Sequence, residues 1–468
     1  MPEPTSALPL ETLDKERILH PATSIADHLK QGPRIMAEGR GITLVDTEGR
    51  QYLDAVAGLW CVNIGYGRHE VADAMAAQAR RLGYYHTFSS MSNEPQIRLA
   101  DRLLGLAPGE PSKVFFGNSG SDANDTQVKL VWYYNNLRGK PKKKKIVARL
   151  GGYHGTTVAS ASLTGLPAFH KAFDLPIASV LHVATPHYYR DAAAGTSEEA
   201  YAASLAAELD GLIEREGPDT VAAFIAEPVM GAGGVLIPPR TYFERIQAVL
   251  RKHDILMIAD KVICGFGRLG RMFGSEVYGI EPDLMTAAKG LTSAYFPLSA
   301  VFISEKVWSV LRDGSPELGT FAHGFTYSGH PVGCAAALAN LDILIGEDLV
   351  GNAARVGAYL QAQLRERFAQ HALVGEVRGL GLIAGVELVA DRRTRSPFDA
   401  SLKVASRVAQ RCLDGGLIVR SLPTGHTLAF SPPLCITRDQ VDEVLDRFGQ
   451  GLDAIADELS RQGEWKAA

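Results

Sequence analysis

Apolar runs alternate with amphipathic stretches between about residues 70 and 335. The amphipathic stretches have the spacing of helices, whereas the short apolar runs between them are typical of strands. Strands that alternate with helices in this way predict an α/β fold with a mainly parallel sheet and helices on both of its faces. The strand-like runs are VAAFIAE, ILMIAD, LMTAA and LSAVFIS.

The pattern changes after about residue 340. A long helical stretch leads to the short strand-like runs EVRG, LIAGVELVA and GLIVRSL, and then to an amphipathic helix near residues 437–460. This is the pattern of a smaller α/β domain. We therefore predict a large domain over residues 61–335 and a small C-terminal domain over 336–468, with residues 1–60 packed on the small domain.

Composition and charge narrow the class of protein. The chain has 468 residues, 46% of them hydrophobic, which is enough for a sizeable core and two domains. Its net charge of −4 gives no basic excess for nucleic acid or an anionic membrane. No apolar run resembles a signal peptide or a membrane span. A soluble, unsecreted protein is expected.

The cysteines and one lysine run add little chemistry. Five cysteines, at positions 61, 264, 334, 412 and 435, form no C-x-x-C pair, and no histidines cluster at ligand spacing. Neither disulfides nor a metal site is therefore expected, and a reducing cytoplasm fits best. The run KPKKKK at 140–145 has a nuclear signal or nucleic-acid patch as one interpretation, but a solvated loop before the next strand is favoured.

Two residues suggest a pyridoxal phosphate (PLP) site. Lys289 directly follows the run LMTAA, in the segment AAKG (287–290), and Asp260 ends ILMIAD. A PLP enzyme needs a lysine amine that forms a Schiff base with the cofactor and a carboxylate that keeps the pyridine nitrogen protonated. Either residue alone is more often a surface lysine or a turn former. Ligands of parallel sheets bind beyond the carboxyl ends of the strands, where Glu227 of VAAFIAE also lies.

A small-residue loop supplies a candidate phosphate site. Residues 117–127 read GNSGSDANDTQ and run into a helical pattern. The N–H groups of Gly120 and Ser121, the Ser121 hydroxyl and the helix dipole together can bind a phosphate. The alternative is an ordinary helix cap by Ser119 or Ser121, with Asp122 complementing the dipole.

Further glycines and aromatics have two interpretations each. In GGYHG at 151–155, glycines allow close approach of a ligand and Tyr153 can stack on a flat ring. Gly265, Gly267 and Gly270 match G-x-G-x-x-G, but no amphipathic helix follows them, so a dinucleotide site is not favoured. Trp60, between two apolar neighbours, is also compatible with a plain core position.

Together these elements resemble the class III (omega) aminotransferases of PLP fold type I, and more narrowly the amine:pyruvate transaminases. The resemblance extends from His20-Pro21 to about residue 450. The segments that carry it are GLWCVNIGYG (58–67), YYHTF (84–88), NSGSDAND (118–125), KLVWYYNN (129–136), GGYHG (151–155), AEPVMGAGG (226–234), GFGRLGRMFG (265–274) and AAKGLTSAYFPLSA (287–300).

The resemblance implies a role for each matching residue. Lys289 matches the lysine that binds the cofactor covalently, and Asp260 matches the partner of its ring nitrogen. Thr326 matches a threonine that reaches the phosphate held by the neighbouring subunit, which implies a homodimer with shared sites, or a tetramer of such dimers. Arg420 matches the arginine that binds the carboxylate of pyruvate or alanine. The other matches are Val262 and Tyr153 on the two ring faces, Gly120 and Ser121 at the phosphate, His154 and Glu227 beside the cofactor, and Trp60, Phe88 and Tyr153 around the substrate.

The implied reaction has two halves. A primary amine, diamine or omega-amino acid gives its amino group to the cofactor, and pyruvate then takes it to become alanine. Lys289 acts as general base and acid. The alternatives are a class III decarboxylase or aminomutase, and a catalytically silent binding protein, against which the intact Lys289 and Asp260 argue.

One position departs from the family pattern. Relatives usually carry Asp-Glu-Val where this chain has Asp260-Lys261-Val262. Successive side chains of a strand point to opposite faces, so Lys261 is expected to point away from the cofactor. No compensating acid can be identified, and an unpaired cation is the favoured expectation.

Overall fold

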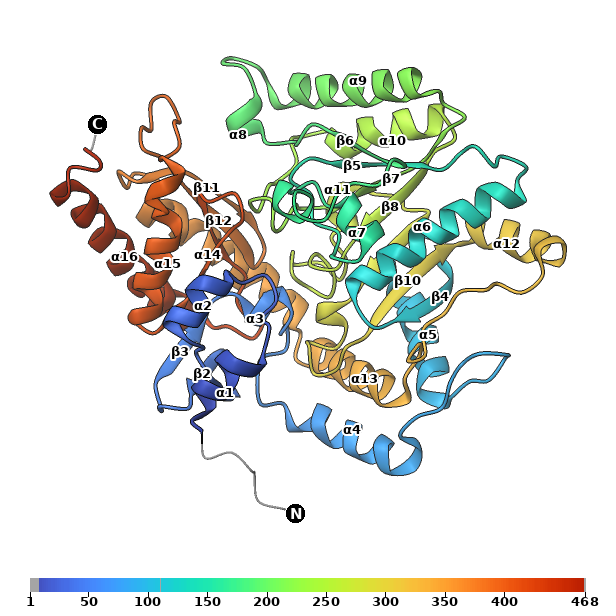
Figure 1. The fold of residues 1–468 in the computed structure, drawn as a ribbon, viewed down its shortest axis with the longest axis horizontal. Helices are drawn as coiled ribbons and strands as arrows, with labels where there is room; N and C mark the ends of the chain where they lie inside the picture. The colour runs from blue at the N-terminus through green and yellow to red at the C-terminus, as the bar shows by residue number, and fades with distance from the viewer. Residues whose placement is uncertain (1–7, 110, 467–468) are drawn as a thin grey trace.

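The computed structural model describes residues 8–109 and 111–466. Its centre is a seven-stranded sheet with the order β4-β10-β9-β8-β7-β5-β6 (Figure 1). Neighbouring strands from β6 to β9 are parallel, whereas β10 runs antiparallel to both β9 and β4. The predicted mainly parallel α/β sheet is confirmed. The strands are β4 (Pro111–Gly117), β5 (Lys145–Arg149), β6 (Val180–Val183), β7 (Val221–Ala226), β8 (Leu256–Asp260), β9 (Leu284–Ala287) and β10 (Ser299–Ser304).

Alternate side chains of the central strands pack on opposite faces of this sheet. On β7, Phe224 joins the core beneath helices α9 and α10, and Ile225 joins the core beneath α6. Both side chains are fully buried, and each such burial contributes about 1.5–3 kcal/mol. Both faces are thus covered and polar groups collect at the strand ends. The helices around the sheet are α6 (Gly120–Leu137), α7 (Val158–Leu163), α8 (Tyr188–Asp191), α9 (Glu198–Glu216), α10 (Tyr242–Lys252), α11 (Ser275–Tyr278) and α12 (Glu305–Leu318), with the short turns η1 (Pro167–Phe169) and η2 (Lys289–Leu291).

A four-stranded antiparallel sheet, with the order β11-β12-β15-β14, lies in the C-terminal part of the chain. The ring of Phe448 on α16 meets the ring of Phe430 on β15 edge to face, with 4.9 Å between centroids. The predicted last helix is present over Arg438–Arg461. The elements here are β11 (Val374–Leu380), β12 (Ile383–Leu388), β14 (Arg420–Ser421), β15 (Thr427–Phe430), η3 (Ala400–Leu402), α14 (Leu349–Phe368), α15 (Val404–Asp414) and α16.

A third sheet joins the beginning of the chain to its C-terminal part. Its order is β1-β2-β3-β13, and Leu417 of β13 pairs in parallel with Leu53 of β3. The predicted boundary after residue 335 falls inside α13, which packs on α4 and α5, so the domain limits stay a prediction. The remaining elements are β1 (Met36–Arg40), β2 (Thr43–Asp46), β3 (Gln51–Asp54), β13 (Leu417–Ile418), α1 (Leu10–Arg17), α2 (Ile25–Gln31), α3 (Ala57–Trp60), α4 (His69–Leu82), α5 (Glu94–Leu106) and α13 (Pro331–Gly346).

The expectation of a solvated lysine loop at 140–145 was wrong for Lys143. Its side chain is buried, and its Nζ donates to the carbonyls of Pro218 and His253 at 2.9 and 3.0 Å. Lys145 pairs with Glu216 at 2.7 Å. The charge run could not reveal these acceptors, because they come from distant segments.

Within residues 8–109 and 111–466, no helix has the length and apolar character needed to cross a membrane. All five cysteines are free thiols. Cys264, Cys334 and Cys412 are buried, and burial raises the pKa of each of these thiols. They are packing residues in their protonated form.

Candidate active site

Asp260 is held rigidly at the carboxyl end of β8. Its side chain is buried, and Oδ2 lies 2.9 Å from the donor Nδ2 of Asn124 and 2.8 Å from Nδ1 of His154. Oδ1 accepts from the backbone N–H of Val262 at 3.0 Å. One carboxylate oxygen is thus doubly bound, and the other can accept one further donor.

Asn124 is a site residue that the sequence analysis did not single out. Its Oδ1 accepts from the hydroxyl of Thr286 at 2.7 Å, so its NH₂ group must face Asp260 and the carbonyl of His154, to which it donates at 2.7 Å. Gln127 in turn donates to Thr286. Asn124 lies within the segment NSGSDAND, but nothing in that pattern shows that its amide reaches a strand end more than 130 positions away.

Lys289 follows β9 in a strained conformation. It is the first residue of η2 and has a φ of 46°, a left-handed value that costs a non-glycine residue about 1–3 kcal/mol. Its side chain is half-buried. Loss of hydration lowers the pKa of its amine, against the opposing effect of Cys61, Asp260 and Glu227. A lysine with a lowered pKa is more often in its nucleophilic, neutral form.

The N-terminus of α6 has both an ordinary helix cap and groups that can bind a phosphate, the two interpretations that the sequence left open. Ser119 is the ordinary cap, because its hydroxyl accepts from the N–H of Asp122 at 3.1 Å. Ser121 is therefore not needed as the cap, and its Oγ accepts from the N–H of Thr156 at 3.1 Å. The Ser121 hydroxyl proton remains available to donate to an anion.

Glycines allow the loops to approach closely at this point. A Cβ atom on Gly120 would lie 2.9 Å from Cγ2 of Val262. One on Gly155 would lie 2.5 Å from Oγ of Ser121. Larger residues at either position would force the start of α6 away from the GGYHG loop or from the end of β8.

Glu227 and Tyr153 lie beside Asp260 at the neighbouring strand end. Glu227 is buried, its two oxygens accept from the N–H groups of Tyr153 and Gly231 at 3.1 and 2.9 Å, and burial raises the pKa of its carboxyl. Tyr153 is half-buried and packs edge to face on Phe169. His154 is buried behind Asp260, and its Nε2 has no hydrogen-bond partner among the described residues.

Arg420 brings a cation to this group of acids and lysine. It is the first residue of β14, it is half-buried, and no carboxylate of the described residues lies within 4.0 Å of it. Burial lowers the pKa of its guanidinium, against the opposing effect of Tyr153. The charge of Arg420 also contributes to the lowered pKa of Lys289. The structure thus brings together Lys289, Asp260, Glu227, Tyr153 and Arg420.

The other predicted substrate residues lie differently. Trp60 is 3% exposed and packs with Val229 and Ile263, a position that suits both a pocket wall and a core residue. Phe88 is 46% exposed, and Thr326 is exposed, with its carbonyl accepting from Tyr84. Within the described part of the chain, no hydrogen bond or ring contact links these two residues to Lys289, so a single chain leaves them at its surface.

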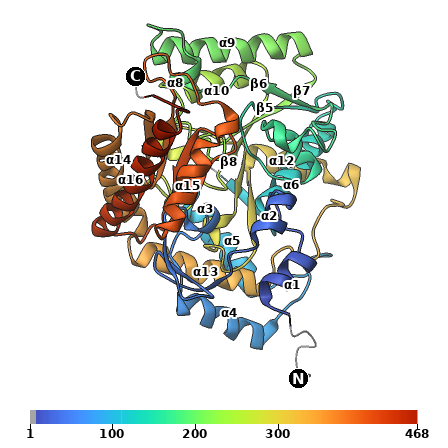
Figure 2. The same ribbon diagram turned by 60° about the vertical axis from the view of Figure 1, so that its left-hand side comes forward.

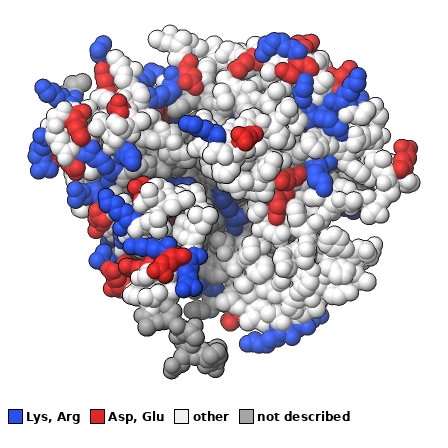
Figure 3. All heavy atoms as spheres, in the orientation of Figure 1, with Lys and Arg blue, Asp and Glu red and all other residues white. Residues whose placement is uncertain are grey.

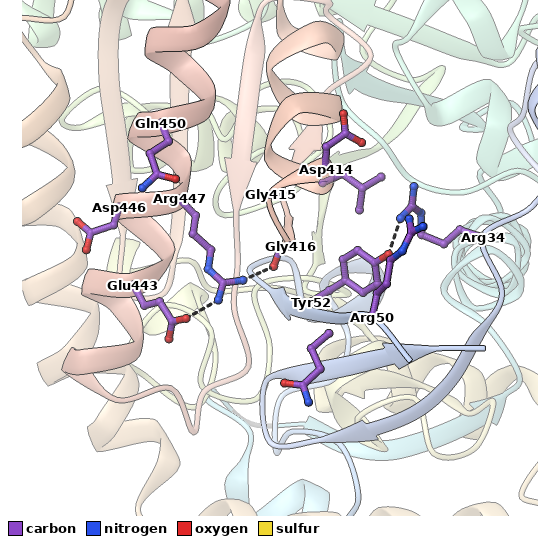
Figure 4. A pocket seen from close by; sticks show the side chains of 12 residues that line it. Arg34, Arg50, Tyr52, Asp414, Gly415, Gly416, Glu443, Asp446, Arg447 and Gln450 are labelled. Atoms are coloured by element: carbon purple, nitrogen blue, oxygen red, sulfur yellow. Dashed lines mark hydrogen bonds and ion pairs between the residues drawn. The ribbon is translucent and has the colours of Figure 1, made fainter. Parts of the chain in front are cut away.

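The surface is hollowed between the large-sheet half and the half that contains the two smaller sheets, and Lys or Arg side chains are visible in the hollow (Figure 3). A different cavity, of about 670 Å³, lies between β3 and the helices α15 and α16 (Figure 4). It contains none of the residues discussed above. Arg34 donates to Tyr52 there, and Arg447 donates to Gly416 and Glu443, so each of these two guanidiniums already has a partner.

Comparison with known proteins decides the family. The family model of class-III aminotransferases matches residues 25–452. The chain belongs to the class-III aminotransferases. A diaminobutyrate–2-oxoglutarate transaminase of Halomonas elongata is 51% identical to this aminotransferase over 97% of this chain and 98% of that protein. The mitochondrial gamma aminobutyrate transaminase 1 of Solanum lycopersicum is 48% identical over 90% and 81%, respectively.

Solved structures give the same result. The omega transaminase from Pseudomonas jessenii in complex with PMP superposes with a TM-score of 0.95 at 49% identity, over 97% of this chain and 99% of that one. The fold is therefore PLP fold type I, and this class-III aminotransferase is a PLP-dependent enzyme, as its sequence predicted.

The residues of this aminotransferase fit that cofactor. The start of α6 offers the Ser121 hydroxyl and free N–H groups to a phosphate, and Gly120 keeps the space open. Asp260 has the spare acceptor that a protonated ring nitrogen requires, and Val262 follows it at the strand end. Lys289 supplies an amine with a lowered pKa. When bound, PLP provides an electron sink for the substrate carbon that carries the amino group.

Proposed function

We propose that this aminotransferase transfers the amino group of a primary amine, diamine or omega-amino acid to pyruvate, giving an aldehyde or ketone and L-alanine. The observation that carries the proposal is Arg420, a half-buried guanidinium without a carboxylate partner that lies close enough to Lys289 to influence its pKa. A buried cation without a partner is costly unless a ligand pairs with it. A substrate carboxylate is the natural partner.

Each residue then has a defined task. Lys289 acts as general base when it takes a proton from the substrate carbon that bears the amino group. It acts as general acid when it later gives this proton up. Asp260, held by Asn124 and His154, keeps a proton on the ring nitrogen of the cofactor. Arg420 binds and orients the keto acid.

The number of cationic side chains in the site favours pyruvate as the amino acceptor. Pyruvate has one carboxylate, which matches the one guanidinium identified in the site. A diacid such as 2-oxoglutarate, which the name of the Halomonas elongata relative includes, would need a partner for a second carboxylate. The cation among the largest influences on the pKa of Lys289 is Arg420.

The amine donor is limited to a class rather than to one compound. The similar proteins are named for diaminobutyrate, for gamma aminobutyrate and as omega transaminases. The first two names are those of compounds with an amino group remote from a carboxylate. A terminal amine is therefore the expected donor, with or without a carboxylate.

A homodimer is expected to complete the site. Exposed aromatic and apolar side chains gather in the segments around Phe88 and Thr326, and Figure 3 shows a broad surface without charges on the side where Figure 1 places α5 and α13. Such a patch marks an interface. In a dimer, Thr326 of one subunit would reach the phosphate of the other. The exposed residues are Tyr84, Tyr85, Phe88, Met91, Ile97 and Tyr327.

The reducing cytoplasm is the proposed compartment. It suits a protein whose five cysteines are all free thiols. The partners proposed are the amine, pyruvate and a second copy of the chain.

One experiment tests the substrates. The purified enzyme is incubated with a panel of amines, diamines and omega-amino acids, with either pyruvate or 2-oxoglutarate as acceptor, and the alanine or glutamate formed is measured. We expect alanine from pyruvate with several terminal amines and at least about tenfold less product from 2-oxoglutarate. Faster glutamate formation would overturn the choice of acceptor without affecting the family.

A further inference from the structure

Two histidines and one aspartate meet in the segment α1–α2, outside the active-site residues. His20 Nε2 lies 2.9 Å and His28 Nε2 lies 3.1 Å from the same oxygen, Oδ1 of Asp14. The two imidazole rings are 4.2 Å apart. Figures 1 and 2 both show α1 and α2 side by side, so the helices bring together three groups that are up to 14 positions apart in sequence.

The hydrogen-bonding capacity of this cluster is not satisfied. The side chain of His28 is only 10% exposed, yet its Nε2 has no hydrogen-bond partner among the described residues, because its approach to Asp14 lacks hydrogen-bond geometry. A buried nitrogen of this kind normally has a partner. His20 already occupies the shared Asp14 oxygen at 2.9 Å.

We propose that Asp14, His20 and His28 bind a divalent transition-metal ion such as Zn²⁺. In tetrahedral geometry, metal–nitrogen and metal–oxygen bonds of roughly 2.0–2.2 Å place neighbouring ligand atoms about 3.3–3.6 Å apart. The distances of 2.9 and 3.1 Å are shorter than this spacing, and the side chains would have to move apart by a few tenths of an ångström to admit the ion. Two imidazole nitrogens and one carboxylate are a ligand set typical of such ions.

The surroundings leave room for the remaining ligands. A cavity of about 300 Å³ is bordered by His20, His28, Glu16 and Thr23, and water can reach the cluster through it. Lys15 and Arg17 also border this cavity, and their charges limit the affinity. An affinity in the micromolar range is expected rather than that of a closed four-ligand site.

Two other clusters of this kind are weaker candidates. In one, Glu387 already binds the guanidiniums of Arg190 and Arg378, beside His187. In the other, Asp210 is shared by Lys252 and His253. Cations of the protein already neutralise these carboxylates, whereas among the described residues Asp14 pairs only with the two histidines.

The metal would cross-link parts of the N-terminal segment to one another. The bound ion would hold α1, the turn after α1 and α2 together. This segment has exposed apolar side chains, and their placement would then depend on the metal. The exposed side chains are Ile18, Leu19, Ile25 and Leu29. No metal site was expected from the sequence, because no histidines cluster at ligand spacing along the chain.

The test uses the full-length, tag-free holoenzyme after treatment with EDTA and removal of the chelator. Zn²⁺ is titrated by calorimetry into the wild type and into the variants His28→Ala and Asp14→Asn, with His253→Ala as the matched control from another cluster. Circular dichroism and bound PLP absorbance confirm that each variant is folded. We expect one Zn²⁺ per chain, at least about tenfold weaker binding in the first two variants, and unchanged binding in the control.

A second readout is independent of affinity. Limited proteolysis should cut the segment between α1 and α2 several-fold more slowly with Zn²⁺ than with EDTA, and the His28→Ala variant should not show this difference. The proposal is overturned if the wild type binds no Zn²⁺, or if Zn²⁺ binds equally well to His28→Ala and Asp14→Asn.

Discussion

The ammonium nitrogen of Lys261 donates to the sulfur of Met285 at 2.6 Å, on the pair of strands whose ends hold Asp260 and Lys289. Lys261 is fully buried, and its amine also lies 4.9 Å from the centre of the Phe273 ring. Among the described residues no carboxylate lies within 4.0 Å of it, and Glu276 is the acid whose charge raises its pKa most. As expected from the sequence, Lys261 has no acidic partner among the described residues, and its side chain binds Met285 rather than Asp260.

This environment predicts a pH-dependent stability. Burial lowers the pKa of Lys261 to about 7, from 10.5. Between these two pH values the unfolded chain binds a proton that the folded chain lacks. The free energy of unfolding should therefore rise as pH increases from about 7 to about 10.5, and this gain should be lost as pH falls back towards 7. The expected contribution is roughly 2–5 kcal/mol.

The substitution Lys261→Met removes this titration. The variant should be more stable than the wild type at pH 7, and the difference should shrink towards pH 10, as measured by denaturant unfolding of the holoenzyme. Lys143→Met is the matched control, because Lys143 is also buried but binds two carbonyl groups, and its loss should destabilise the protein. A Lys261→Met variant with unchanged stability at pH 7 would show that this lysine is solvated. The kcat of the Lys261→Met variant should be close to that of the wild type.

Asp260→Asn tests the partner of the ring nitrogen. The substitution keeps the shape of the side chain but removes a charge-assisted hydrogen bond worth about 1.5–3 kcal/mol, so kcat should fall at least about tenfold. Single-turnover kinetics with alanine measure the proton-transfer step directly. Wild-type kcat in a variant that retains PLP would remove Asp260 from this role.

Arg420→Ala should separate the two half-reactions. Loss of a buried carboxylate partner costs roughly 2–5 kcal/mol, or about 30-fold to several thousand-fold in rate, for pyruvate and alanine. Amines without a carboxylate should react at nearly the wild-type rate. Stopped-flow measurement of each half-reaction checks this, and equal losses in both would mean that Arg420 supports the fold instead.

Gly120→Ala should weaken PLP binding, because its new methyl group would lie 2.9 Å from Val262 Cγ2 at the start of α6. We expect at least about tenfold lower affinity for PLP, measured by equilibrium dialysis, and partial recovery when Val262→Ala is added. Gly105→Ala is the control, since a Cβ at Gly105 of α5 meets no atom within 4 Å. Its effect should be neutral or slightly stabilising.

The sequence was most informative where a residue's role depends on its own strand or loop. The apolar runs predicted the strands, and their last residues predicted the positions of Asp260 and Glu227, because parallel strands share one edge. The sequence could not show the antiparallel direction of β10, since a buried strand has the same apolar pattern in either direction.

Long-range partners were also beyond the sequence. Asn124, which holds Asp260 in place, lies on α6, whereas Asp260 ends β8. The carbonyl groups that bind Lys143 come from two separate loops. Such pairs depend on packing in three dimensions rather than on periodicity. Thr326 and Phe88 are exposed in a single chain, so their expected roles depend on a second subunit.

The most direct measurement of the central claim is chemical labelling of the cofactor lysine. The holoenzyme is reduced with borohydride, digested and mapped by mass spectrometry, with Lys289→Ala as the control. We expect the phosphopyridoxyl label on Lys289, and we expect the control to carry no label and to show no transamination. A label on another lysine, or an active Lys289→Ala variant, would contradict the central claim.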